Sequence, residues 1–286
     1  DTLDPGASLP TPVALAIDFP ATLQLALAGS ITGTPLLTAG PVTIGGTAEF
    51  ALTRQTVDVD TDGNGTADLL GATLDGIALS VNGASVVVTG VASVTVSGNL
   101  AVARITPAGV GATVRYTALK MGDVTVTAST AAAGDFGLSG TLTINTLNTN
   151  SAATGYGRID WAQAFDLNGD GTQDTLDPGA SLPTPVALAI DLSSGLELMV
   201  SGSVAGTGVV GAPGGGDDTA FLTVAGVTIS GSVQFAMSVQ RVDLKVGATL
   251  YDDVKLTTFA LRINQPVSLT VDAISASITS GMLGVA

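Results

Sequence analysis

Two short acidic stretches carry the residue types and the spacing that could do chemistry in this chain. The first, residues 166–177, reads D-L-N-G-D-G-T-Q-D-T-L-D. Its oxygen-bearing side chains fall at loop positions 1, 3, 5, 9 and 12, which are Asp166, Asn168, Asp170, Asp174 and Asp177. Position 6 is a glycine that permits a sharp turn, and Thr172 at position 7 offers its backbone carbonyl. Clustered oxygen ligands are what Ca²⁺ prefers, so the spacing predicts a calcium site. The alternative is an ordinary acidic turn.

The second stretch, residues 60–68, reads D-T-D-G-N-G-T-A-D and keeps the same spacing as far as position 9. Its ligands would be Asp60, Asp62, Asn64, Thr66 and Asp68. Position 12 is Gly71, which has no side chain, although Asp58 lies just upstream and could substitute. We predict a second calcium site here; the alternative is a tight hairpin loop between two strands.

Both stretches resemble the calcium loops of EF-hand and dockerin-type repeats, over about twelve residues rather than over a domain. The first loop departs from the EF-hand by having Asp177, not Glu, at position 12. The prolines that follow disfavour an exit helix. Residues 159–165, IDWAQAF, hold the single Trp161 and lie where the incoming helix of an EF-hand would be, so we expect one short helix there.

A duplication organises the whole chain. Residues 1–18 and 174–191 are identical, and similarity continues after them at a shift of 173 residues and then, past an insertion, of 185. We therefore expect a full repeat over residues 1–173 and a second, C-terminally shortened repeat over residues 174–286. The natural partners of such repeats are the neighbouring repeats of the same chain.

The hydrophobic pattern predicts an all-β fold. Short stretches of alternating polar and apolar residues recur between Gly, Asn, Asp and Pro, and several centre on a glycine, as in VTISGSV around Gly231. Such alternation is typical of half-buried strands, and a glycine within a strand marks a bulge or a close approach. We expect an elongated, solenoid-like stack of short strands; the alternative is a pair of tandem β-sandwiches.

Composition excludes several classes of function. The chain has 24 acidic and 9 basic residues, a net charge of −15, so it should repel nucleic acid and anionic membranes. It has no His, which removes the usual general base, and no Cys. No apolar run reaches the ~18 residues of a membrane helix, so no membrane insertion is expected. We expect no enzymatic activity.

Acidic, cysteine-free β repeats with near-identical copies and D-x-N-x-D-G loops resemble the repeat regions of giant bacterial calcium-dependent adhesins of the RTX type. The nonapeptide of true RTX β-rolls is absent. The resemblance implies an extracellular or cell-surface location and a structural role as a calcium-stiffened stalk or spacer. Two alternatives stay open: an adhesin module that binds a glycan or a protein, for which Trp161 and Tyr156 are candidates, and, more remotely, a polysaccharide-active enzyme.

Overall fold

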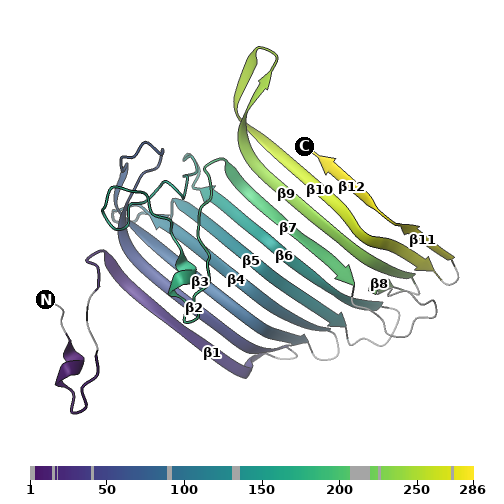
Figure 1. Ribbon diagram of the computed structural model, residues 1–286, viewed down its shortest axis with the longest axis horizontal. Helices are drawn as coiled ribbons and strands as arrows, with labels where there is room; N and C mark the ends of the chain where they lie inside the picture. Colours follow the sequence, from purple (N-terminus) through teal and green to yellow (C-terminus); the bar gives the residue numbers. More distant parts are fainter. Residues whose placement is uncertain are drawn as a thin grey trace.

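The described residues form one open antiparallel sheet (Figure 1). The computed structural model describes residues 4–14, 17, 19–39, 42–88, 92–130, 136–206, 220–224, 227–271 and 274–286. Within them are twelve strands and two short 3-10 helices. The elements are η1 (Pro5–Ser8), β1 (Leu23–Ala39), β2 (Val42–Val59), β3 (Leu69–Val88), β4 (Ala92–Thr106), β5 (Tyr116–Thr130), β6 (Phe136–Ala152), η2 (Pro178–Ser181), β7 (Leu196–Gly206), β8 (Ala220–Val224), β9 (Val227–Val246), β10 (Thr249–Val271), β11 (Ile274–Ile278) and β12 (Gly281–Val285).

The sheet is a meander in which neighbours in sequence are neighbours in space. Its order is β1-β2-β3-β4-β5-β6-β7-β9-β10-β11. The short strand β8 pairs with β6 and β9, and β12 pairs with β10 beside β11. Strand β1 forms one edge, and β11 and β12 form the other (Figure 1).

The all-β class and the elongated series of strands are confirmed. The strands are longer than the short ones expected, and they lie side by side in a single sheet; the described residues form no pair of facing sheets. Some of the Gly, Asn and Asp residues that suggested strand ends are instead bulges inside continuous strands. One example is the register shift between Val81 and Ala84 in β3, and another is Asp123, with φ of 54° inside β5.

The predicted glycine irregularities also occur. Gly98 in β4 has φ of 145°, a conformation that side chains rarely adopt, and the register with β5 shifts between Ser97 and Asn99. This bulge matches the strand-centred glycine phrase in the sequence.

One connection covers part of one face of the sheet. Residues 153–195, which we call the strap, join β6 to β7 and run across the strands before them, with η2 lying over β2, β3 and β4 (Figure 1). Nearly all of the buried apolar side chains lie between the strap and β2–β5. They are Val57, Val59, Ala72, Leu74, Ala101, Ala103, Ile105, Tyr116, Ala118, Ile159, Trp161, Ala164, Phe165, Leu176, Leu188, Ile190 and Leu192.

The short helix expected over residues 159–165 does not form. The segment is extended at its start and then turns, with the Gln163 N–H donating to the Asp160 carbonyl at 3.1 Å. The Trp161 N–H instead donates to the Leu192 carbonyl at 2.9 Å. Pairing between the two ends of the strap therefore takes the hydrogen bond that a helix would have used.

The sequence repeat and the packing unit are offset. The boundary predicted between residues 173 and 174 falls inside the strap, and Leu182 of the second copy packs against Ala51 and Ala78 of the first. The strands that follow the strap have no such cover: from β7 onward, Val239 is the only buried hydrophobic side chain among the described residues.

Candidate metal centre

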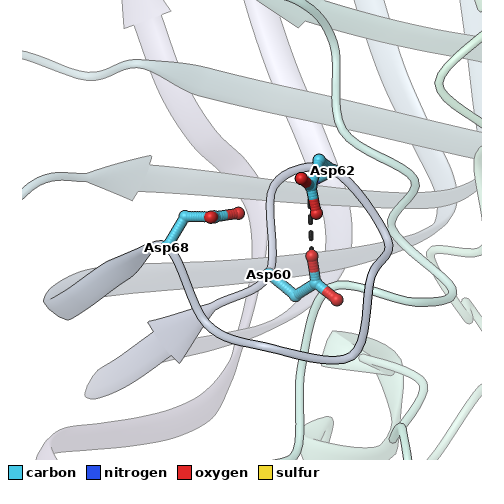
Figure 2. Close-up of side chains that lie close together, drawn as sticks. All are labelled: Asp60, Asp62 and Asp68. Atoms are coloured by element: carbon cyan, nitrogen blue, oxygen red, sulfur yellow. Dashed lines mark hydrogen bonds between the residues drawn. The ribbon is translucent and has the colours of Figure 1, made fainter.

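The turn between β2 and β3 brings three carboxylates together (Figure 2). One oxygen from each of Asp60, Asp62 and Asp68 lies within 4.8 Å of the other two. In the part of the chain that the structure describes, no other group of three Asp, Glu, His or Cys side chains is this close. Asp60 is buried, while Asp62 and Asp68 are exposed. These three side chains could hold a metal ion.

Backbone N–H groups shape this loop around Asp60. Its Oδ1 accepts from the N–H groups of Asp62 and Gly63, at 3.2 and 2.7 Å, and its Oδ2 accepts from Gly65 at 2.7 Å. The φ angle of Gly65 is 84°, in the left-handed region that favours glycine. The glycine at position 6 is thus what allows the chain to turn back over the carboxylate.

These contacts keep Asp60 ionised. Burial by itself raises the pKa of this carboxyl group, but the N–H groups of Gly65, Gly63 and Asp62 donate to its charged form. The net result is a lowered pKa. A cation ligand must be deprotonated, so Asp60 is in the required state at neutral pH.

The first part of the other loop has the same structure. Asp166 Oδ1 accepts from the Gly169 N–H at 2.7 Å, and its Oδ2 accepts from the Gly171 N–H at 2.8 Å. The φ angles of Gly169 and Gly171 are 76° and 83°, within a degree of the values at the matching glycines of the first loop. The shared spacing in the sequence therefore encodes a shared backbone.

Position 9 closes both loops in the same way. Asp68 Oδ2 accepts from the N–H of Thr61 at 2.9 Å, and Asp174 Oδ2 accepts from the N–H of Leu167 at 2.7 Å. In each loop the position-9 N–H donates to the carbonyl just before position 1, of Val59 or Phe165. Both loops are closed without help from position 12.

Positions 3, 5 and 7 are joined by short-range hydrogen bonds. Asn168 Oδ1 accepts from the Asp170 N–H at 2.8 Å, and Asp170 Oδ1 accepts from the hydroxyl and the N–H of Thr172. These two contacts, the hydroxyl first, lower the pKa of Asp170. In the other loop Asn64 Oδ1 accepts from the Thr66 N–H at 2.8 Å.

The residues considered for position 12 contact other segments. Asp177 caps η2, and its Oδ1 accepts from Gly179 N–H at 3.1 Å and from Leu188 N–H at 2.9 Å. Asp58 Oδ1 accepts from the Gly71 N–H at 2.7 Å. Of the predicted ligands, the structure gathers the carboxylates of Asp60, Asp62 and Asp68, and it does not bring three carboxylates of residues 166–177 equally close.

Both loops lie where the strap meets the sheet. The Asp60 N–H donates to the carbonyl of Ala164, just before the strap loop, at 3.0 Å. Asp58 and Asp166 line one open groove of about 350 Å³ at this junction. A cation in either loop would therefore bind at the point where the connection is attached to β2.

Sequence reasoning missed the residue that ties the two ends of the strap to the sheet. Asn150 on β6 is 1% exposed. Its Nδ2 donates to the carbonyls of Ile159 and Ser193, each at 2.9 Å, and its Oδ1 accepts from Trp161 Nε1 at 3.0 Å. Nothing in the sequence marked it, because Asn148 and Asn150 both read as ordinary polar residues of an alternating strand.

Two charged side chains on the covered face fasten the strap further. Lys120 Nζ donates to the Ala189 carbonyl at 2.6 Å and to Asp191 at 2.8 Å. Glu49 accepts from the N–H and the hydroxyl of Thr184, at 2.8 and 2.9 Å. The available signal for both was a charged residue flanked by apolar residues in an alternating stretch.

The two aromatic residues considered for ligand binding differ in position. Trp161 is fully buried and stacks at a tilt on Phe165, with ring centroids 5.8 Å apart, so it cannot contact an external ligand. Tyr156 is exposed, with the Arg115 guanidinium 4.2 Å from its ring centroid. It lines a groove of about 550 Å³ together with Arg158, Arg241 and Asp253.

Comparisons with protein families, with curated proteins and with solved structures found no match. No helix among the described residues is long and apolar enough to cross a membrane. The features that bear on function are the strap, the loop within it over residues 166–177 and the loop over residues 60–68 between β2 and β3.

Proposed function

We propose that this chain is a structural repeat, an extracellular stalk or spacer segment that calcium stiffens. The observation that carries the proposal is the junction at which the strap meets β2. Two loops with the same backbone lie there, and the Asp60 N–H binds the strap directly through Ala164. The wide sheet around this junction has no other described connection that packs over it.

Charge explains why calcium would stiffen the junction. Asp60, Asp62 and Asp68 hold their oxygens within 4.8 Å of one another, and without a cation these charges repel. A bound Ca²⁺ replaces repulsion with coordination and fixes the turn. Extracellular modules bind calcium at about 10⁻⁴–10⁻³ M, so such sites fill outside cells and stay empty inside them.

The experiment is a thermal melt in calcium and in chelator, with calcium titration calorimetry on the same protein. At about 100 times the dissociation constant, calcium should raise the free energy of unfolding by about 2.7 kcal/mol per site. Magnesium at the same concentration should do much less, because Mg²⁺ demands tighter octahedral geometry. Equal melts in calcium, magnesium and chelator would contradict the proposal.

Single-site variants separate the two loops. Asp62→Asn keeps an acceptor for the Asn64 N–H but removes one charge from the first cluster. Asp170→Ala removes one charge from the strap loop, together with the acceptor of the Thr172 N–H. We expect each to weaken or abolish one of two calorimetric sites. Asp75→Asn is the matched control, since Asp75 pairs with Arg54 away from both loops.

A second candidate is an adhesin module that binds a glycan or a protein. The exposed Tyr156 and the neighbouring Arg158 and Arg241 favour it, because they offer an aromatic surface and two hydrogen-bonding cations in one groove. A glycan-array screen of the wild type and of Tyr156→Ala tests this candidate. Binding that the variant loses would favour the adhesin over the spacer.

A further inference from the structure

The N-terminal segment, residues 4–14, 17 and 19–22, has the same local conformation as the second copy of its sequence. Asp4 accepts from the Gly6 N–H at 3.1 Å and caps η1, as Asp177 accepts from Gly179 at 3.1 Å and caps η2. The Val13 N–H donates to the Gly6 carbonyl at 3.2 Å, the same distance as in the strap. Over residues 4–13 the segment therefore has the conformation of the strap.

Three large apolar side chains of its described residues are exposed, whereas their counterparts in the strap are buried. Leu9 is 46% exposed while its counterpart Leu182 is 3% exposed, and Ile17 is 46% exposed while Ile190 is fully buried. Phe19 is 69% exposed. An identical sequence in an identical local conformation thus lacks only the sheet surface on which the strap rests.

That surface is a row of small residues in register. Leu182 packs on Ala51 of β2 and Ala78 of β3, which face each other across the two strands, and Ala78 in turn faces Ala101 of β4. We call this row the platform. Small side chains let the backbone of η2 approach the sheet closely.

The C-terminal part of the sheet contains a second platform with nothing over it. Ala236 of β9 faces Ala260 of β10, and Ala260 faces Gly284 of β12, all three exposed. The sequences agree as well: FAL at residues 259–261 matches IAL at residues 77–79. Since η2 rests on β2, β3 and β4, the matching strands β9, β10 and β12 offer η1 a comparable surface.

We propose that the N-terminal segment of one molecule docks on the platform of β9, β10 and β12 in a second copy of this chain. The segment adjoins β1 at one edge of the described sheet, whereas this platform lies at the other edge and the strap already covers β2, β3 and β4, so we place the platform on a second copy. The interface is heterologous, so the molecules assemble head to tail. The proposal does not depend on calcium in either loop.

The contact between Thr184 of the strap and Glu49 of β2 has a partial counterpart in the docked arrangement. Thr184 donates to Glu49, and the matching residues are Thr11 and Gln234, whose amide oxygen can accept the same two hydrogen bonds. The platforms differ at Gly76, which lies under Pro178, because its counterpart Thr258 carries a side chain held by Ser238 at 2.7 Å. Docking between molecules should therefore be weaker than the contact within the chain.

Cysteine cross-linking tests the proposal, because the natural chain has no Cys. A Leu9→Cys protein is mixed with an Ala260→Cys protein and treated with a short bis-maleimide. We expect a cross-linked heterodimer that forms in much higher yield than with Phe259→Cys, whose side chain lies one residue away on the opposite face. Thr258→Gly in the Ala260→Cys protein should raise the yield.

The positive control is Leu182→Cys with Ala78→Cys in one chain, which should cross-link internally because these residues are in contact. If the control reacts while Ala260→Cys gives no more heterodimer than Phe259→Cys, the proposal is wrong. It is also wrong if Leu9→Cys reacts equally well with Ala78→Cys in another molecule, since that would be exchange of the strap itself. Leu9→Asp should lower the average mass in sedimentation equilibrium.

Discussion

At the scale of single residues, the strap is held by a few polar side chains on an otherwise apolar face. Asn150 satisfies the carbonyls of Ile159 and Ser193 and the indole N–H of Trp161. The hydrogen bonds to Ile159 and Trp161 are buried, and a buried polar group whose hydrogen bond is not made costs ~1–3 kcal/mol. Asn150 therefore contributes more to the stability of the fold than the size of its side chain suggests.

We expect Asn150→Ala to lower the free energy of unfolding by about 2–4 kcal/mol, because it removes the hydrogen-bond partner of the buried Trp161 indole and of the Ile159 carbonyl. Urea denaturation measures the loss. Asn148→Ala is the control from the same strand: the buried Asn148 Oδ1 has no hydrogen-bond partner, so this change should cost much less. Equal losses would contradict the assigned role of Asn150.

The surroundings of Glu197, at the start of β7, predict how stability changes at acid pH. A hydrogen bond from Lys255 lowers its pKa, partial burial opposes this, and the charges of Lys255, Arg158 and Arg241 lower the pKa further. Because the folded-state pKa is the lower one, this contribution is present above the unfolded pKa of about 4.3 and is lost as pH falls through the folded value.

Glu197→Gln should therefore lower the urea midpoint slightly at neutral pH, and this effect should shrink as the pH falls toward 3. The difference should also shrink in high salt, since water and ions screen this exposed pair. Urea titrations of both proteins at the two pH values measure it. A difference that persists unchanged in acid would mean that packing, not charge, is responsible.

At the scale of the element, the strap shows that burial is not a local property. Leu9 and Leu182 occupy the same place in identical sequences and have opposite exposures. The loops could be predicted from the sequence because the hydrogen bonds that close them join residues at most nine positions apart, as between Asp68 and Val59. The crossing of the strap over β2–β5 could not, because it depends on contacts such as Glu49 with Thr184, 135 residues apart.

Leu9 and Leu182 offer a matched test in one protein. Leu182→Ala should cost about 2–5 kcal/mol of stability, the usual range for a buried leucine. Leu9→Ala makes the same chemical change in the same local conformation and should cost almost nothing in dilute protein. Thermal melts of the two variants measure the difference. A large loss from Leu9→Ala at low concentration would mean that the N-terminal segment is covered within its own molecule.

At the scale of the whole molecule, packing is concentrated at one end of a wide sheet. The buried apolar residues cluster between β2–β5 and the strap, whereas β9–β12 have strand pairing and little else. Strand pairing alone gives marginal stability in water. The far end of the sheet should therefore open more readily than the covered end.

Native-state hydrogen exchange should show this gradient. We expect the slowest amides around Ala101–Ile105 in β4 and their neighbours in β3, and exchange in β10 and β12 that is faster by orders of magnitude, because local opening there does not uncover the core. Mass spectrometry of peptides from each strand measures it. Uniform protection would mean that the sheet opens only as a unit.

The number of strands per repeat has a consequence of its own. Six strands separate the start of β1 from the start of β7, and because the number is even, both strands run in the same direction. The connection before each of them therefore falls at the same end of the sheet. Any further copy joined in this register would advance the pattern by six strand spacings, about 29 Å. Its strap loop would extend an evenly spaced row of acidic loops along one rim; an odd number would alternate them between opposite rims.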